Sequence, residues 1–425
     1  MALNEISSLM KLRRNLHLSP LELQKLQLKK LKAIVSYAYD NVPFYHQKFD
    51  LAGVKPFDLV SLEDLTRFPV ITKQEIQSAP PESLIARNPV PYVKRSTSGS
   101  TGIPLTVAID KTRVAFENVI WLRALFANGF SIRDKMVVIN DPRNFPKSKS
   151  VLQKFGIMRS KYVSIFDDAK SLASACRSYK PDIIKGYPSS IELLARELNK
   201  VNDYKARLIF TSAEVLDPIT KKLLNSISQD GFLDNYACSE FSLLAWECRK
   251  HEGYHINADS VAMEFISDGE AVASGESGEI ICTSLSNTAT PLIRYKIGDR
   301  GVPVEDKCSC GVTLPLMKIV EGRTDDFLIA TDGHKVPPTI FFPYPFESFD
   351  DVKGFKVIQE TKNKLRFQLV VTDDFSKKNS LQKATSELKS VFGADMNIEF
   401  EFLSNLDKGQ SRKLRKVISL VSKEE

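Results

Sequence analysis

The sequence predicts an α/β protein in two parts: a large, multi-layered N-terminal domain with mostly parallel sheets, and a small α+β C-terminal domain. Its 425 residues are too many for one ordinary hydrophobic core, which favours two domains of unequal size. Between residues 130 and 285, short β-branched runs alternate with stretches of helical period, as in parallel strands joined by helices. The tail changes character, because two strand-like runs there precede a helical run and a further strand.

The first clear element is a helix over residues 21–39, where leucines, Ile34 and Val35 recur at helical spacing. Ser19-Pro20 marks its start, and Asn41-Val42-Pro43 ends it. In the alternating region we expect strands at 136–139, 183–184, 208–211 and 279–283, and helices at 190–199 and 218–227. In the tail we expect strands at 355–359, 364–371 and 397–402, and a helix at 380–392. The domain boundary is expected at residues 321–326, where turn residues separate two apolar runs.

Composition places the chain among soluble globular enzymes, with 43% hydrophobic and 26% charged residues. It contains no apolar run long enough for a transmembrane helix, and its first residues lack a signal-peptide core, so we expect a cytoplasmic protein. The net charge of +7 suits anionic ligands such as nucleotides. The basic cluster at residues 412–416 has no interleaved aromatics, so neither nucleic-acid binding nor stable membrane insertion is expected.

A run rich in glycine and hydroxylated residues, from Ser96 to Pro104, is the first candidate for chemistry. Glycines let backbone N–H groups approach phosphate oxygens closely, and hydroxyls add further donors. The run is not a Walker A loop, because it lacks the Gly-Lys-Ser/Thr ending. A flexible polar surface turn is the alternative interpretation. The candidate phosphate-binding residues are Ser96, Ser98, Gly99, Ser100, Thr101 and Gly102.

This run resembles the phosphate loop of the adenylate-forming enzymes, which include acyl-CoA synthetases, peptide-synthetase adenylation domains and luciferases. A second segment, residues 235–240, resembles that superfamily's aromatic-Gly-x-Thr-Glu motif, with Ala237 in place of the usual glycine. The resemblance implies that Tyr236 lies against adenine, Ser239 meets phosphate and Glu240 helps to hold Mg²⁺. An aromatic face suits a purine, and a hard carboxylate suits magnesium. A strand end with a buried tyrosine is the alternative.

Two later motifs follow in the order of the superfamily. Residues 291–299 resemble its Arg-Tyr-x-x-Gly-Asp motif, which implies that Asp299 accepts both ribose hydroxyls of ATP or AMP. Residues 322–326 resemble its Gly-Arg-x-Asp-Asp hinge, which implies that Arg323 contacts the nucleotide and that Asp325 is the pivot of a mobile small domain. The implied domains are therefore 1–323 for ATP and carboxylate binding and 324–425 for the cap.

The C-terminal segment 406–417 resembles the superfamily's Gly-Lys motif, whose lysine reaches the acyl carboxylate and the α-phosphate. By register the role falls on Lys413, although Arg412 stands where glycine is usual. Lys408 and Lys416 are rival candidates. A solvated basic tail is the alternative interpretation.

Within the superfamily the chain looks like phenylacetate–CoA ligase and its relatives in capsule and surface-polysaccharide gene sets. The segments that carry this likeness include 41–45, 68–73, 186–190 and the stretch 212–214, which adds Glu214 to the cofactor-binding candidates. The resemblance implies an acid–thiol ligase that adenylates a small carboxylic acid and passes it to coenzyme A. Tyr187 and Ala237 would line the acid pocket.

Two alternatives stay open for the function. The acceptor could be an amine, such as an amino sugar or its precursor, or the chain could be a non-catalytic binding protein with a degraded site. The sequence also leaves a homodimer open.

A zinc site is the last candidate. Cys308 and Cys310 form a Cys-x-Cys pair, and Cys248 with His255 could complete a tetrahedral Cys₃His structural site. His251 is the alternative to His255, and reduced thiols without metal are the alternative to the site as a whole. The remaining cysteines, Cys176, Cys238 and Cys282, are expected to be reduced core thiols.

Overall fold

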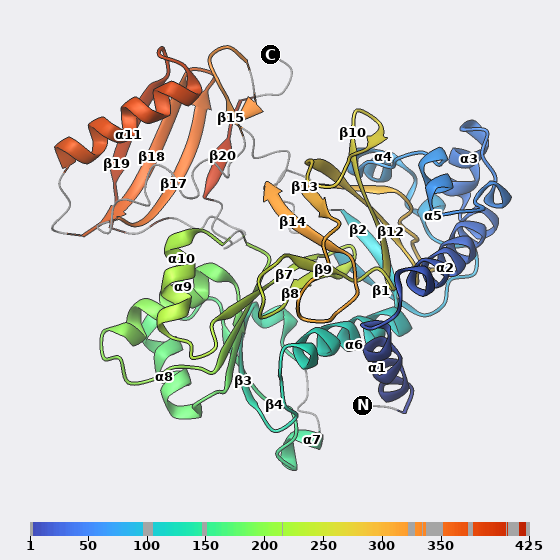
Figure 1. The fold of residues 1–425 in the computed structure, drawn as a ribbon, viewed down its shortest axis with the longest axis horizontal. Coiled ribbons are helices and arrows are strands. Elements are labelled where there is room, and N and C mark those ends of the chain that lie inside the picture. The colour runs from blue at the N-terminus through green and yellow to red at the C-terminus, as the bar shows by residue number, and fades with distance from the viewer. Residues whose placement is uncertain are drawn as a thin grey trace. The chain divides into compact units, whose positions relative to one another are not determined.

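The structure of the chain is a computed structural model, and it is a mixed α/β fold with a large multi-stranded part and a smaller C-terminal sheet (Figure 1). It describes residues 3–96, 105–146, 151–214, 216–321, 328–333, 335–336, 352–372, 377–404, 406 and 416–421. The chain divides into two compact units, residues 1–131 with 233–320, and residues 132–232 with 321–425. The expected boundary at 323/324 lies outside the described residues, so the division into domains 1–323 and 324–425 stays a prediction.

The first unit begins with helices that follow the expected capping chemistry. Helix α2 starts after Ser19, which forms a capping box with Glu22: the Ser19 hydroxyl accepts from the Glu22 amide, and the Glu22 carboxylate accepts from the Ser19 amide at 2.8 Å. Its buried face packs Leu31 and Val35 into the core of this unit. The helices are α1 Leu3–Asn15, α2 Pro20–Asn41, α3 Pro43–Leu51, α4 Lys73–Ser78, α5 Pro81–Leu84 and α6 Lys111–Ala127, with 3₁₀ turns at Pro56–Asp58 and Glu63–Arg67.

The strands of the first unit are mostly antiparallel. Their order is β11-β10-β12-β13-β14-β9-β8-β7, with β1 and β2 as a separate hairpin. Short turns connect several of these strands where a parallel pair would need a helical crossover. The strands are β1 Tyr92–Ser96, β2 Thr106–Asp110, β7 Phe232–Cys238, β8 Ser242–Glu247, β9 Tyr254–Ile256, β10 Val261–Ser267, β11 Glu270–Ala271, β12 Gly278–Ser284, β13 Tyr295–Val304 and β14 Leu316–Glu321. The strand expected at 279–283 is therefore present as β12, but it pairs antiparallel with β10 and β13.

The second unit contains the parallel strands that the alternating pattern predicts. Their order is β4-β3-β5-β6, and the three pairings are all parallel. Helices α8, α9 and α10 pack beside one another next to these strands (Figure 1). The elements are β3 Lys135–Asn140, a 3₁₀ turn Pro142–Asn144, α7 Val151–Lys154, β4 Arg159–Ser164, α8 Ala169–Tyr179, β5 Ile183–Gly186, α9 Pro188–Asn199, β6 Leu208–Ser212 and α10 Pro218–Ser226.

The C-terminal part of the second unit has its own sheet and core. Strands β17 and β18 alternate buried and half-buried residues, and Val357, Phe367 and Leu369 point into a core that also contains Leu388 and Phe392 of helix α11. Strand order is β19-β18-β17-β20, with β17–β18 antiparallel and the outer two pairings parallel. The elements are β15 Leu328–Ile329, β16 Lys335–Val336, β17 Val352–Thr361, β18 Lys364–Val371, α11 Lys377–Phe392, β19 Asn397–Phe402 and β20 Val417–Ser419.

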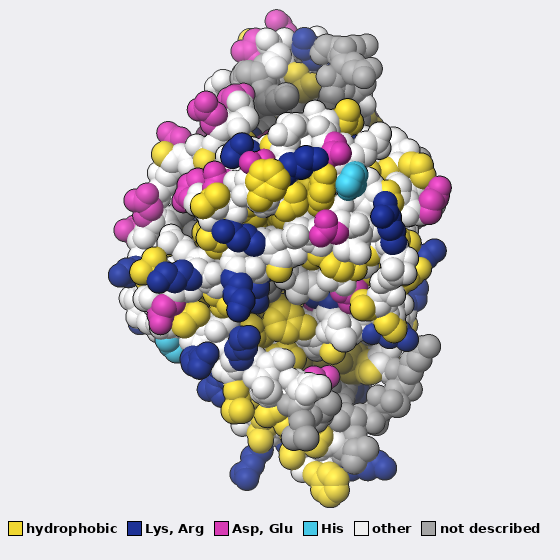
Figure 2. All heavy atoms as spheres, turned by 90° about the vertical axis from the view of Figure 1, so that its right-hand side faces the viewer, with side chains coloured by type: hydrophobic (Ala, Val, Ile, Leu, Met, Phe, Trp, Pro, Cys, Tyr) yellow, Lys and Arg dark blue, Asp and Glu magenta, His cyan; other side chains and the backbone are white. Residues whose placement is uncertain are grey.

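The surface carries the basic excess seen in the composition. Figure 2 shows one face of the molecule, on which lysine and arginine side chains gather toward the centre and acidic side chains are scattered between them. No helix among the described residues has both the length and the apolar character needed to span a bilayer.

Candidate functional site

Two of the sequence motifs meet in the first unit through a direct side-chain contact. Tyr236, in β7, donates its phenolic hydrogen to the Asp299 carboxylate in β13 across 2.7 Å, although 63 positions separate them in the chain. Burial raises the pKa of Tyr236 well above its ordinary value, and the Asp299 charge adds to this effect. The phenol is therefore neutral at physiological pH and acts as a hydrogen-bond donor. An aromatic ring and a carboxylate are thus held side by side.

The turn after β7 brings Glu240 to the same motif. The hydroxyl of Tyr295, the middle residue of the 291–299 segment, lies 3.4 Å from Glu240 Oε1. Strands β7 and β8 pair tightly on both sides of this turn, with a register shift between Tyr236 and Ala237. Ser239 lies within the turn, and the half-buried Ala237 lies at the end of β7. The structure therefore brings Tyr236, Ser239, Glu240 and Asp299 onto neighbouring segments of one unit.

Arg294 of the same motif has a structural position. Its guanidinium is buried, donates to the carbonyl oxygen of Thr66 at 2.8 Å, and pairs with Glu264 at 3.0 Å. The backbone also joins this motif to the 68–73 segment, because Ile71 donates to the Arg294 carbonyl and Lys296 donates back to the Ile71 carbonyl, both at 2.9 Å. The 68–73 segment, one of the segments that resemble phenylacetate–CoA ligase, is thus hydrogen-bonded to the motif that carries Asp299.

Of the Ser/Thr/Gly run, only Ser96 is described, at the exposed end of β1, where its hydroxyl lies 2.8 Å from the Thr106 hydroxyl. Ser98, Gly99, Ser100, Thr101 and Gly102 lie outside the described residues, as do Arg323, Asp325 and Lys413. Their roles stay predictions. Lys416, a rival for the Lys413 role, is described: its ammonium pairs with Asp217 and lies 4.0 Å from Glu192.

The second unit contains two further predicted site residues, Tyr187 and Glu214, which follow the carboxyl ends of parallel strands. Tyr187 follows β5 directly and lies just before helix α9, and its hydroxyl lies 3.3 Å from Asn140 at the end of β3. Glu214, after β6, accepts from the backbone amide of Ser189 at 2.8 Å and from the Ser189 hydroxyl at 3.0 Å. A side chain at Gly186 would be crowded, because its Cβ would lie 3.0 Å from Ile139 Cβ and 3.2 Å from the Ile139 carbonyl oxygen. The carboxyl ends of parallel strands are the usual place for ligand sites in α/β folds.

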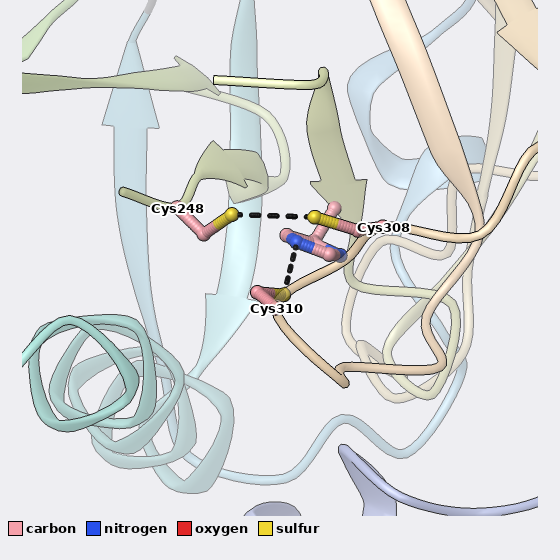
Figure 3. Close-up of side chains that lie close together, drawn as sticks. Cys248, Cys308 and Cys310 are labelled. Atoms are coloured by element: carbon pink, nitrogen blue, oxygen red, sulfur yellow. Dashed lines mark hydrogen bonds between the residues drawn. The ribbon is translucent and has the colours of Figure 1, made fainter. Parts of the chain in front are cut away.

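Three cysteines and a histidine form a compact cluster in the first unit. The ligand atoms of Cys248, His255, Cys308 and Cys310 all lie within 4.8 Å of one another. Cys248 Sγ lies 3.4 Å from Cys308 Sγ, and Cys310 Sγ lies 3.4 Å from His255 Nε2. Figure 3 shows the three cysteines directed toward a common point from two segments, one with Cys248 and one with Cys308 and Cys310. A tetrahedral zinc site with Zn–S bonds of about 2.3 Å has ligand–ligand edges of about 3.8 Å, so these distances fit the metal.

Strand register explains why these four residues meet. Strand β9 lies between β8 and β14, with His255 opposite Trp246 on one side and Leu316 on the other. The segment after β8 carries Cys248 and the segment before β14 carries the Cys-x-Cys pair, so both reach His255. Backbone amides also point at the sulfurs, at 3.5 Å for Lys250 to Cys248 and 3.4 Å for Val312 to Cys310. Gly311 supports the second turn with a φ of +84°, which favours glycine.

The alternative histidine lies elsewhere. His251 is 45% exposed and pairs with Glu247 at 3.6 Å. His255 is fully buried, and burial lowers its pKa to about 4, so its imidazole is neutral, as a metal ligand must be. The six cysteines are all free thiols, and Cys176 and Cys282 are fully buried as expected, whereas Cys238 is partly exposed.

Comparison with known proteins identifies relatives over most of the chain. The chain is 33% identical over 325 residues to the phenylacetate–coenzyme A ligase of Escherichia coli (strain K12), covering 72% of each chain. It is 25% identical over 417 residues to protein CapK of Staphylococcus aureus, covering 94% of this chain and 89% of CapK. Residues 328–420 match the family described as the CapK C-terminal domain.

Solved structures share the fold. A 2-hydroxyisobutyryl-CoA ligase in the postadenylation state, in complex with 2-HIB-AMP, superimposes with a TM-score of 0.79 at 20% identity, covering 96% of this chain and 91% of that chain. The anthranilate CoA ligase AuaEII, in complex with anthranoyl-AMP, superimposes with a TM-score of 0.55 at 16% identity, covering 76% of this chain and 65% of that chain.

Proposed function

Because the chain belongs to the phenylacetate–coenzyme A ligase family, we propose that it converts a small carboxylic acid to an acyl-adenylate and then to a coenzyme A thioester. This assigns it to the ATP-dependent acid–thiol ligases. The observation that carries the proposal is the hydrogen bond between Tyr236 and Asp299. It joins two separate motifs through the residues that would contact adenine and ribose.

In the first step, a carboxylate oxygen of the acid attacks the α-phosphorus of ATP. The bond from that phosphorus to the oxygen bridging the α- and β-phosphates breaks, and pyrophosphate leaves. The ring of Tyr236 would lie against adenine while Asp299 accepts the ribose hydroxyls, and Ser239 would donate to phosphate. Holding the nucleotide in this way orients the α-phosphorus toward the acid, which is a large part of the catalytic effect.

In the second step, the thiol of coenzyme A gives up its proton to water and its sulfur attacks the acyl carbon. The bond from the acyl carbon to the phosphate oxygen breaks, and AMP leaves with that electron pair. No protein nucleophile is needed in either step. Lys413 and Arg323 would offset the negative charge that builds up on the phosphate, and the Ser/Thr/Gly run would donate to the departing pyrophosphate. Rotation about Asp325 would exchange the groups that serve the two steps.

Magnesium is implied by the reaction, and Glu240 is the residue that would hold it. A carboxylate is the hard oxygen ligand that Mg²⁺ prefers, and the ion would neutralise charge on the phosphates of ATP. Glu240 fits this role because it lies on the turn that follows Tyr236 and beside Tyr295. Tyr187 and Ala237 stay the candidates for the acid pocket, and Glu214 stays a cofactor-binding candidate.

We further propose that the Cys₃His cluster holds a structural zinc ion. The donor set is complete for tetrahedral coordination, so no position is left open for a substrate or water. The ion would tie together three segments that are up to 62 residues apart, from Cys248 to Cys310. Such a site contributes to folding and takes no part in the ligase reaction.

A screen for pyrophosphate release tests the ligase proposal. The purified chain is incubated with Mg·ATP and a panel of aromatic, fatty and sugar-derived carboxylic acids, with and without coenzyme A. We expect pyrophosphate with at least one acid, and a thioester only when coenzyme A is present. No pyrophosphate with any acid, together with no binding of ATP, would instead indicate a non-catalytic binding protein.

The same screen decides the acyl acceptor. An amine of an amino sugar or its precursor stays the second candidate for the acceptor. If pyrophosphate forms with an acid but coenzyme A yields no thioester, amino sugars are then tested as acceptors, and an amide product would identify the second candidate as correct.

A further inference from the structure

A buried ion-pair network joins helix α6 to the turn that carries Glu240, and the steps above make no use of it. Glu117 lies at its centre, with a side chain only 5% exposed. Its carboxylate accepts two hydrogen bonds from Arg95, at 2.7 Å from Nη2 and 3.3 Å from Nη1. Arg113, one helical turn before Glu117, places its Nε 3.4 Å from the same carboxylate. One carboxylate thus lies between two guanidinium groups.

Each of the two arginines also holds the backbone of the turn. Arg95 Nη1 donates to the carbonyl oxygen of Ser239 at 3.1 Å, and Arg113 Nη2 donates to the carbonyl oxygen of Phe241 at 3.1 Å. Ser239 and Phe241 are the two neighbours of Glu240 in the sequence. The carbonyl groups of the residues before and after the proposed magnesium ligand are therefore held by guanidinium groups that share one buried carboxylate.

The same network includes the end of strand β1, where the Ser/Thr/Gly run begins in the sequence. Arg95 lies in β1, one residue before Ser96, where the run begins. Trp121, in helix α6, donates its indole N–H to the Ser242 hydroxyl at 3.2 Å, so the helix also contacts the residue that follows the turn. Helix α6 thus contacts both the end of strand β1 and the turn that carries Glu240.

Charge and shape explain why arginine is needed at position 95. The guanidinium group is planar and presents several N–H donors in a fixed fork, so it can bind a carboxylate with two bonds and a carbonyl with a third. A lysine ammonium is a compact point charge on a flexible stem, and it cannot hold the two groups in one plane.

We propose that Arg95 and Glu117 are positioning residues for Glu240, the proposed ligand of the Mg²⁺ ion of Mg·ATP, because they hold the backbone of the Ser239–Phe241 turn. This inference rests on the proposed ligase function. It predicts a selective effect on affinity. Binding of Mg·ATP depends on the position of this turn, while binding of AMP, which lacks the two outer phosphates, depends mainly on Tyr236 and Asp299.

Calorimetric titration of the full-length chain with Mg·ATP and, separately, with AMP tests the proposal. In Arg95→Lys we expect the dissociation constant for Mg·ATP to rise about tenfold, as for the loss of one charge-assisted hydrogen bond. The dissociation constant for AMP should change less than threefold. Glu117→Gln, which keeps the size of the side chain but removes its charge, should give the same selective loss. The double variant should be no worse than the weaker-binding single variant, because both changes break one unit.

Arg207 offers a matched control. It pairs with Asp134 at 2.6 Å, and its side chain is 27% exposed, compared with 28% for Arg95. Arg207→Lys should bind both nucleotides as the unaltered chain does.

Three results would overturn the inference. If the unaltered chain binds Mg·ATP and both single variants bind it equally well, the positioning role is wrong and the ligase proposal is unaffected. If Arg95→Lys and Glu117→Gln weaken Mg·ATP and AMP to the same extent, the network has only a general structural role. If the unaltered chain binds neither nucleotide, the ligase proposal fails and this inference fails with it.

Discussion

Replacing Asp299 with asparagine tests the proposed nucleotide site at the contact that supports it. In the structure, Asp299 Oδ2 already accepts a hydrogen bond from Tyr236 at 2.7 Å. A carboxylate offers about four acceptor positions, so enough remain for both ribose hydroxyls. An asparagine side chain of the same shape keeps one acceptor oxygen, but its amide nitrogen can only donate.

The expected loss follows from these bonds. Two charge-assisted hydrogen bonds to ribose contribute about 2 kcal/mol each, and asparagine would keep one neutral bond of about 1 kcal/mol. The difference of about 3 kcal/mol corresponds to a roughly 100-fold rise in the dissociation constant for AMP. This value is large enough to separate from experimental error and small enough to remain measurable.

Calorimetry with AMP and with 2′,3′-dideoxy-AMP isolates the ribose term. The unaltered chain should bind AMP roughly 1000-fold more tightly than the dideoxy nucleotide, because both bonds of about 2 kcal/mol are lost, and Asp299→Asn should prefer AMP by only about fivefold. Asp234→Asn is the control, because Asp234 accepts from Tyr254 at 2.8 Å in a second tyrosine–aspartate pair of the same unit. It should keep the full preference for AMP. The reasoning is refuted if Asp299→Asn retains that preference, or if it loses affinity for both nucleotides alike.

Three further predictions concern other parts of the chain. Metal analysis of the purified, chelator-free protein should find one zinc per chain. Cys310→Ser should lose most of this zinc and unfold at a lower temperature, as metal analysis and thermal unfolding would show. Cys176→Ser, which alters a buried thiol outside the cluster, should keep the zinc. Lys413→Ala should slow pyrophosphate release about 100-fold with little change in folding, and an unchanged rate would transfer the role to another lysine. Burial raises the pKa of Asp217, but the paired Lys416 ammonium and the hydrogen bonds from Thr220 outweigh it, so the pKa lies below its ordinary value of 3.8. The pair therefore stabilises the fold above that pH and loses its effect as the pH falls through the lowered pKa. Lys416→Met should reduce the free energy of unfolding by about 3 kcal/mol at pH 7 and by less at pH 3, and an equal loss at both values in urea titrations would contradict this assignment.

The bounds of individual helices and strands were predictable where a single local sequence pattern determines them. The helix expected over 21–39 is present as Pro20–Asn41, because its cap and its apolar stripe lie in the sequence itself. The strands expected at 364–371 and 397–402 match β18 and β19 at both ends. In each case neighbouring residues carry the whole signal.

Pairing between distant segments was harder to predict. The run at 279–283 was expected among mostly parallel strands, yet β12 pairs antiparallel, because a fully buried strand shows the same apolar run in either arrangement. His255 and His251 could not be separated by spacing, and only the register of β9 with β14 places His255 beside the cysteines.

The network on α6 shows a further limit of sequence reasoning. Arg113 and Glu117 stand four residues apart in a helix with a long apolar stretch, and this spacing predicts that the two charges pair. The sequence does not reveal which carbonyl groups those charges hold, because the turn at Ser239–Phe241 lies more than 120 residues away.

The first unit is discontinuous along the chain, and this affects its biosynthesis. Residues 1–131 supply its helices and the β1–β2 hairpin, but the strands on which they pack come from 233–320. A ribosome that adds about 5–20 residues per second needs roughly 10–40 s to make the intervening and closing segments. During that interval the apolar faces of α2 and α6 lack the strands on which they pack, so the nascent chain exposes apolar surface until β14 emerges.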